Sequence, residues 1–387
     1  MNIERLLKDA AAAETREVTR ESLPPLALPA RRRRRQRPAG RWLVPVAAVL
    51  TVIAVVAVTV TLRGTMRGPD ALGAHEGTPY FLATHRKGGV GVFDSWTGRR
   101  IADIEPRAGH YAALAAAADQ RTFFLADEVA ACRTRIDKVT LRRDGTVASK
   151  KTLPGGFGSQ VDDMAVSADG RRVALVFNNF NGCRGDDLTV VEVPSGRSRA
   201  WRLPNSDGSP SYVKSPVWAA DGRTLLFAGD NQGKDADHPV GDVLRALDTR
   251  STGTALADAR IVLTMGSGDV GDLDLSSFRP SPDGRTVTAI SEDTSDHGTF
   301  RSVAVVELPL SAGAGAGAGK APVRELARMT ARQIAPAAPT DFRTTLDATG
   351  RHLLVSSRHD RAIFRMDDGR VRRLPDLHRT DLGLIAW

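Results

Sequence analysis

Carboxylate side chains are the residues of this chain whose positions most directly suggest chemistry. Six of them stand near the starts of short apolar runs: Asp162, Asp163, Asp272, Asp274, Asp341 and Asp381. If those starts surround one opening, carboxylates there could bind a cation or a basic peptide end. Hydrated carboxylates without a ligand are the alternative, because acidic side chains are mostly exposed to solvent. These six residues are the candidate ligand-binding residues of the sequence.

A second acidic cluster lies in one polar segment and consists of Asp230, Asp235, Asp237, His238 and Asp242. Oxygen ligands at short spacing can hold Ca²⁺, but this spacing does not follow an EF-hand loop. A solvated acidic loop explains the same residues. The sequence therefore assigns no metal and no cofactor.

Local motifs of known catalytic chemistries are absent from the sequence. It has no Gly-x-Ser-x-Gly nucleophile elbow, no His-Glu-x-x-His pair and no phosphate-binding Walker loop. The eight histidines are scattered, and His352 and His359, which flank one apolar run, are expected at the surface. No catalytic residue is assigned, although an active site assembled from several repeats would leave no local motif.

The elements that must position these residues repeat along the chain. An apolar run, a polar turn with Asp-Gly or a relative of it, and a second apolar run recur at residues 113–125, 165–176, 217–228, 278–289 and 345–355. Asp-Gly between two strand-like runs is a strong hairpin signal, because both turn residues accept positive φ. Asp169, Asp221 and Asp283 are thus predicted to be turn residues rather than catalytic acids.

Each hairpin is followed by a third apolar run and a fourth, more polar one. Counting the third runs gives six units, at residues 90–98, 138–145, 187–196, 243–253, 302–310 and 362–369. Four strands per unit, with the innermost small and apolar, are typical of β-propeller blades. We predict an all-β fold, a six-bladed β-propeller, with seven blades as the alternative. The starts of the innermost strands would surround one mouth of its central channel.

The first of these units lacks an innermost strand of its own. The segment 381–387 (DLGLIAW) has the character of such a strand and no hairpin after it. We predict that it pairs with the first unit and closes the ring, which removes the exposed sheet edges.

The turn residues resemble those of bacterial propeller families with WD-repeat-like or TolB-like blades, whose turns carry Ser-Pro-Asp-Gly-Arg. Residues 281–285 match this pattern fully, 167–171 lack the proline, and 219–223 lack both Ser and Pro. The resemblance covers residues 78–387 and implies the fold. It implies no activity, because propellers host binding modules and enzymes alike.

The two cysteines of the chain fall in equivalent loops of adjacent units. Cys132 lies 13 residues after Asp119, and Cys183 lies 14 residues after Asp169. Such loops share one face of a ring, and the pair is predicted to form a disulfide in an oxidising exterior. Two unpaired thiols are the alternative.

The basic charge of the chain belongs to its N-terminal part. Residues 1–63 carry 12 Lys or Arg and 5 Asp or Glu, so they account for +7 of the net +9. A nucleic-acid-binding domain would need a basic face in the folded body. No nucleic-acid partner is therefore expected.

Residues 42–62 contain no charged side chain and are long enough to cross the roughly 30 Å hydrocarbon core of a bilayer. Seven arginines precede this segment, at positions 31–35, 37 and 41. Under the positive-inside rule, residues 1–41 form a cytoplasmic tail, 42–62 a transmembrane helix, 63–77 a stalk and 78–387 an extracellular propeller. A cleavable signal peptide is the alternative for the apolar segment.

Three hypotheses about function follow from this organisation. The first is a plasma-membrane-anchored propeller that binds or senses an extracytoplasmic protein or small ligand. The second is an extracytoplasmic hydrolase or lyase with its site at the channel mouth. The third is a transmembrane regulator whose residues 1–28 bind a cytoplasmic partner such as a sigma factor; apolar residues at helical spacing begin at Ile3.

Overall fold

The computed structural model describes residues 79–387 with gaps at 86, 179–182, 184–186, 203–211, 232–240, 266–273, 295–299, 311–321, 335–341, 358–361, 368 and 375–382. The predicted tail, transmembrane segment and stalk lie outside the described residues. No helix in the described part of the chain is long and apolar enough to cross a membrane.

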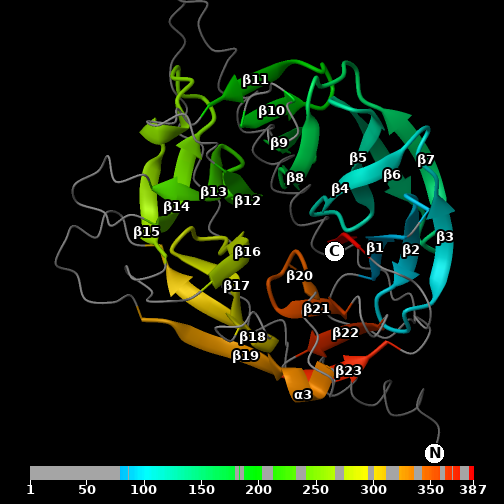
Figure 1. The fold of residues 1–387 in the computed structure, drawn as a ribbon, viewed down its shortest axis with the longest axis vertical. Coiled ribbons are helices and arrows are strands. Elements are labelled where there is room, and N and C mark those ends of the chain that lie inside the picture. The colour runs from blue at the N-terminus through cyan, green and yellow to red at the C-terminus, as the bar shows by residue number, and fades with distance from the viewer. Residues whose placement is uncertain are drawn as a thin grey trace, which may run out of the picture. The chain divides into compact units, whose positions relative to one another are not determined.

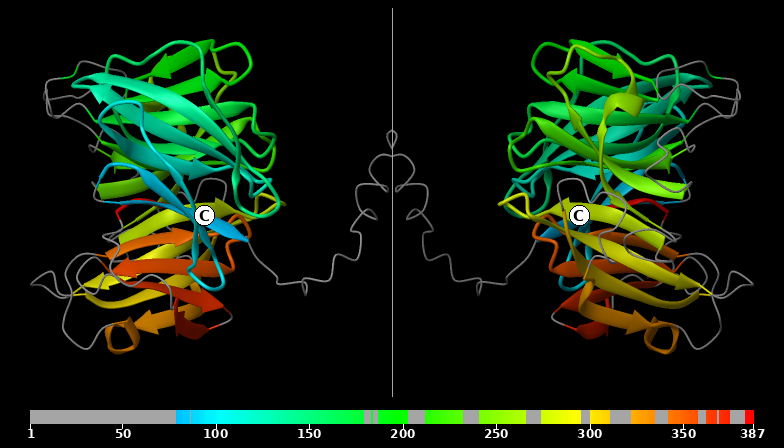
Figure 2. Two further views of the ribbon diagram at one scale, coloured as in Figure 1. Left: turned by 90° about the vertical axis from the view of Figure 1, so that its right-hand side faces the viewer. Right: turned by 90° about the vertical axis from the view of Figure 1, so that its left-hand side faces the viewer.

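Six four-stranded antiparallel sheets are arranged as blades around a central axis (Figure 1). The prediction of a six-bladed, all-β propeller is confirmed, and the seven-bladed alternative is wrong. Seen from the side, the strands cross the thickness of the ring (Figure 2), so their connections collect on two faces. The turn face carries the Asp-Gly-type turns at 117–121, 167–171, 219–223, 281–285 and 347–351. The loop face is the opposite one, where the innermost strands begin.

The strands of the first three blades follow, each blade from its innermost strand outward. Blade 1 contains β24 (Ile385–Ala386), β1 (Tyr80–Thr84), β2 (Val90–Asp94) and β3 (Arg100–Ile104). Blade 2 contains β4 (His110–Ala116), β5 (Thr122–Ala130), β6 (Arg133–Leu141) and β7 (Val147–Thr152). Blade 3 contains β8 (Gln160–Val166), β9 (Arg172–Asn178), β10 (Leu188–Glu192) and β11 (Ser198–Trp201).

The other three blades have the same order. Blade 4 contains β12 (Val213–Trp218), β13 (Thr224–Asn231), β14 (Gly241–Asp248) and β15 (Arg260–Thr264). Blade 5 contains β16 (Asp274–Pro280), β17 (Thr286–Thr294), β18 (Phe300–Pro309) and β19 (Arg324–Thr330). Blade 6 contains β20 (Phe342–Leu346), β21 (His352–Ser357), β22 (Ala362–Asp367) and β23 (Arg370–Arg373). A 3₁₀ turn at Leu256–Asp258 and α3 (Ala331–Ile334) connect strands.

The repeated turns are stabilised by their own side chains. In blade 3 the Ser167 hydroxyl donates to Asp169, and Asp169 accepts the Arg171 backbone N–H at 3.0 Å. Where serine is missing, as in blade 4, the following Thr224 donates both its N–H and its hydroxyl to Asp221. These bonds lower the pKa of Asp169 and, against its partial burial, that of Asp221. The prediction that these aspartates are turn residues is confirmed.

The ring closes through pairing between the two ends of the propeller sequence. β24 pairs antiparallel with β1, with Leu82 opposite Ala386, and supplies the innermost strand of blade 1. The Thr84 hydroxyl also accepts the Leu384 N–H at 2.8 Å. The predicted closing segment 381–387 is therefore confirmed for its described residues.

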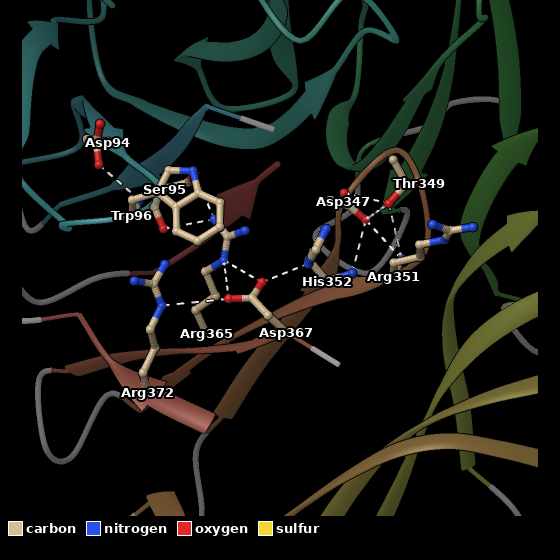
Figure 3. Close-up of polar contacts among 10 residues, drawn as sticks. All are labelled: Asp94, Ser95, Trp96, Asp347, Thr349, Arg351, His352, Arg365, Asp367 and Arg372. Carbon is tan, nitrogen blue, oxygen red and sulfur yellow. Dashed lines mark hydrogen bonds and ion pairs between the residues drawn. The ribbon is translucent and has the colours of Figure 1, made fainter. Parts of the chain in front are cut away.

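A buried arginine reinforces the same seam from the outer strands (Figure 3). Arg365 on β22 of blade 6 is fully buried, and its Nη1 donates to the carbonyl (3.1 Å) and hydroxyl (2.9 Å) of Ser95 in blade 1. Its guanidinium lies 3.8 Å from the ring centroid of Trp96 and 4.9 Å from that of Trp387. Asp367 accepts from its Nε at 2.6 Å. We call these five residues the seam cluster.

His352 supports the seam cluster from β21. The structure buries this residue and places its Nδ1 2.7 Å from Asp367, so the expectation of a surface position for His352 is wrong. The turn before it explains the difference. Asp347, itself fully buried, occupies the serine position of this blade and accepts the backbone N–H groups of Arg351 and His352. His359 lies outside the described residues.

A disulfide joins the loop face of blade 2 to that of blade 3. Cys132 and Cys183 are bonded, with their Cα atoms 5.3 Å apart, as predicted. Cys132 closes the tight β5–β6 turn with a φ of 55°. The bond therefore couples two neighbouring blades at the face where their innermost strands begin.

Removing the disulfide should lower the free energy of unfolding. The double variant Cys132→Ser/Cys183→Ser opens a closure between residues 51 apart, for which the loop-entropy model gives about 4 kcal/mol. Urea unfolding of the oxidised wild type and the variant measures the difference. The same midpoint for both would show that the bond does not constrain the unfolded chain.

Breaking the seam cluster should also destabilise the propeller. Arg365→Met leaves the partly buried Asp367 without its main cation, a change that costs about 3 kcal/mol or more in buried ion pairs. Arg373→Met, an exposed arginine on β23, is the matched control and should stay within about 0.5 kcal/mol of wild type. Thermal unfolding of the wild type and both variants measures these effects. Equal unfolding midpoints for Arg365→Met and Arg373→Met would contradict a role for Arg365 in closure.

Candidate functional site

The central channel forms a cavity of about 580 Å³ lined by the innermost segments of the ring. One part of its wall is polar and comes from blades 3 to 6, with the side chains of Asp162, Asp163, Lys214, Ser215, Ser277, Arg279, Arg343 and Thr344. β4 and the C-terminal segment contribute only apolar residues, among them Ala112, Leu114, Ala116, Leu384 and Ile385, and blades 3 to 5 add apolar residues such as Val166, Val217 and Phe278. The channel is thus an amphipathic pocket.

β-Bulges shape the polar wall. Each innermost strand of blades 2 to 5 carries one extra residue relative to its partner, between Tyr111 and Ala113, Val161 and Asp163, Lys214 and Val217, and Ser276 and Arg279. Two of the bulged residues, Ser215 and Ser277, have φ values of 53° and 52°. Positive φ is unfavourable for serine, and such strained residues cluster at functional sites.

Asp163 connects two blades at these bulges. Its carboxylate accepts the N–H of Met164 at 2.8 Å and the N–H of Ser215, in the next blade, at 2.9 Å. Burial raises the pKa of Asp163 to about 6, and the nearby Asp162 adds to the rise; the two N–H donors and Arg279 oppose it. Asp163 is therefore a carboxyl group that can change protonation near neutral pH.

Arg279 occupies the corresponding region of blade 5. Its guanidinium donates to three main-chain carbonyls, those of Phe278 at 3.0 Å, Leu346 at 3.1 Å and Asp347 at 3.4 Å. Burial lowers the pKa of this guanidinium, while the fields of Asp347 and Asp163 raise it. No carboxylate of the described residues lies within ion-pair distance of it.

Other polar residues of the wall already have partners. Lys214 forms an ion pair with Asp242 at 3.0 Å, and Tyr212 donates its hydroxyl to the same carboxylate. The Thr344 hydroxyl donates to Glu292 at 3.0 Å. Asp242, a member of the predicted acidic cluster, is thus engaged with the channel wall.

The predicted ligand residues are placed as follows. Asp162 and Asp163 line the channel near the start of β8, as the propeller geometry requires. Asp274 begins β16, but its side chain lies outside the described residues, as do Asp272, Asp341 and Asp381. Among the described residues no group of three or more His, Cys, Asp or Glu is placed to hold a metal ion.

The sequence reasoning missed the cationic part of the wall. Arg279 and Arg343 stand in innermost strands, four and six positions before the turn residues Asp283 and Thr349. Ser215 and Ser277 stand six positions before Asp221 and Asp283, which is also the spacing from Asp163 to Asp169. Superposing the repeats on their turns would have collected Asp163, Ser215, Ser277 and Arg343 at one level of the channel, with Arg279 two positions closer to the turn.

Asp163 should make stability depend on pH. Folding raises the pKa of Asp163 from 3.8 to about 6. Its stabilising contribution to the free energy of unfolding is therefore fully present below the unfolded pKa and is lost as pH rises through about 6. Asp163→Asn removes this titration, so the variant should lose less stability than wild type between about pH 4 and 7. Urea midpoints across this range measure the effect.

A turn aspartate provides the control of opposite sign. The pKa of Asp169 is lowered on folding, so its contribution is present above the unfolded pKa and is lost as pH falls. The free energy of unfolding of Asp169→Asn should therefore differ least from that of the wild type at low pH. Parallel pH profiles for wild type and Asp163→Asn would contradict the assignment of Asp163.

Comparison with known proteins gives similarity in solved structures only. No family model matches the chain, and no curated protein matches it. A putative TolB from Agrobacterium tumefaciens is 15% identical with a TM-score of 0.43, over 76% of this chain and 87% of that one.

Two further solved structures have comparable scores. The β-propeller domain of Cps50 (Swd1) from Myceliophteria thermophila is 13% identical with a TM-score of 0.43, over 76% of this chain and 82% of that one. The periplasmic gluconolactonase of Pseudomonas aeruginosa is 16% identical with a TM-score of 0.38, over 77% of this chain and 78% of that one. The chain is similar to these propellers, and at such identities nothing about its activity follows.

Proposed function

We propose that this protein is a membrane-tethered binding protein whose propeller captures a small ligand in its central channel outside the cell. The observation that carries the proposal is the convergence of bulged strands and charged side chains from blades 3 to 6 on one cavity of about 580 Å³. This volume lies within the roughly 300–1,000 Å³ of small-molecule sites, which are concave and carry a few converging polar groups.

The tether and the location are supported by the sequence and the disulfide. Residues 42–62 are uncharged and follow an arginine-rich segment, a pattern that favours a span with the N-terminus in the cytoplasm. Disulfides persist in oxidising compartments and are rare in the cytosol. The Cys132–Cys183 bond is consistent with a propeller outside the cell.

Blocking the channel should abolish ligand capture. Ala112→Phe adds a ring to the channel wall at a partly exposed alanine of β4, whereas Ala148→Phe adds one to an exposed alanine of the outermost strand β7. After exposure to a small-molecule extract of culture medium, mass spectrometry should find a compound on the full-length wild type and Ala148→Phe but not on Ala112→Phe. Identical sets of compounds on all three proteins would refute binding in the channel.

Reporter fusions should place the propeller outside the cell. Trp387 is buried in the closing seam, so a reporter after that residue would disturb the fold; the fusion is better made after Gly73, before the compact unit Ala74–Trp387. Alkaline phosphatase should be active at this position, and a cytoplasm-dependent fluorescent reporter should be dark. The reverse pattern would exclude the proposed topology.

A further inference from the structure

We infer that the channel ligand is a small organic carboxylate with an apolar body, whose anionic group binds Arg279 and Arg343. This inference rests on the proposed function and specifies the chemical class of the ligand. It is carried by the side chains of β16 and β20, the innermost strands of blades 5 and 6.

The first support is the unmatched charge of the two arginines. Arg279 is held by three carbonyl groups, which fix its position but carry no net charge. Arg343, at the start of β20, lines the same cavity with an exposed side chain, and that side chain makes no hydrogen bond or ion pair within the described part of the chain. Arg279 is half-buried, and a cation away from bulk water is stabilised by a counter-ion. The planar guanidinium of either arginine matches a carboxylate with two parallel bonds.

The second support is that other charged groups of the wall are already paired or can be neutralised by protonation. Lys214 is paired with Asp242 at 3.0 Å. The carboxylate of Asp163 is bonded to two main-chain N–H groups, and burial favours its neutral form as pH falls toward 6. Among the described residues that line the cavity, only Asp162 has an exposed carboxylate. With Asp163 protonated, Arg279 and Arg343 exceed Asp162 by one positive charge, and with Asp163 ionised the four charges balance. A singly charged carboxylate therefore suits this wall better than a doubly charged phosphate.

The third support is the apolar part of the wall formed by the closing segment and β4, which begins beside Arg343 where β24 contacts β20. Leu384 and Ile385 of the closing segment and Ala112 and Ala116 of β4 line that side of the cavity. Burying apolar surface there would contribute about 25 cal/mol per Å² to binding. A ligand with an anionic head and an apolar body therefore complements both the arginines and the apolar part of the wall.

Three isosteric probes test the class: phenylacetate, its amide phenylacetamide, and phenethylamine. Binding is measured by equilibrium dialysis against the full chain in detergent micelles at about pH 5.5, where most of Asp163 is protonated. We expect phenylacetate to bind about tenfold or more tightly than the amide, and the amine to bind weakest, because bonds to charged groups are worth about ten- to a hundredfold in affinity.

Two matched arginine variants locate the effect. Arg343→Ala should weaken phenylacetate binding about tenfold or more and leave phenylacetamide unchanged. Arg373→Ala, which removes an exposed arginine on the outermost strand β23, should change neither. Arg343 is exposed, so its removal should leave the melting temperature unchanged, whereas Arg279→Lys tests the half-buried partner with folding monitored in parallel.

Several results would overturn the inference. Tightest binding of phenethylamine would make the acidic residues the recognition site, and equal binding of all three probes would show that charge plays no part. Absence of phenylacetate binding, or an unchanged affinity in Arg343→Ala, would also refute it. The proposed function fails separately, if blocking the channel with Ala112→Phe leaves ligand capture intact.

Discussion

The pairing of β24 with β1 is the interaction on which the rest of the structure depends. A ring of sheets has no exposed edges only if the last strand meets the first, and here two residues opposite Leu82 and Ala83 make that connection. Such a short ladder is weak by itself. The seam cluster strengthens it, because Arg365 reaches Ser95 across 270 residues of sequence while stacking against Trp96 and Trp387. Closure thus combines main-chain pairing with a buried, fully surrounded cation.

Closure of the ring leaves a central cavity, and the bulges in the innermost strands determine which side chains line it. Regular alternation would place every second residue of an innermost strand toward the channel. An extra residue interrupts that alternation, so the consecutive residues Ser277, Phe278 and Arg279 all border the cavity. The same device gives Asp163 its bond to the Ser215 N–H. Strain at Ser215 and Ser277 is the cost of directing polar groups into the centre.

The sequence was most informative where local chemistry decides the backbone. Asp-Gly turns predicted the hairpins, and the weakest of them still holds, since Gln120 adopts a φ of 59° where three other turns have the glycine that follows aspartate. It was least informative where a residue's role depends on another blade. Arg365 and His352 sit in ordinary strand patterns, and only the tertiary contacts to Ser95 and Asp367 explain their burial. Arg279 was missed because a bulge cannot be read from an alternating pattern.

The position of β24 in the chain also sets the order of events during synthesis. Blade 1 lacks its innermost strand until residues 385 and 386 exist, although β1, β2 and β3 are among the first strands made. Throughout elongation the first blade therefore presents an unpaired strand edge, and the channel has no apolar wall from Leu384 and Ile385. The cavity is complete only when residues 384–387, which line it, have been made. A nascent chain stalled between residues 373 and 385 would carry five complete blades and a first blade without its innermost strand.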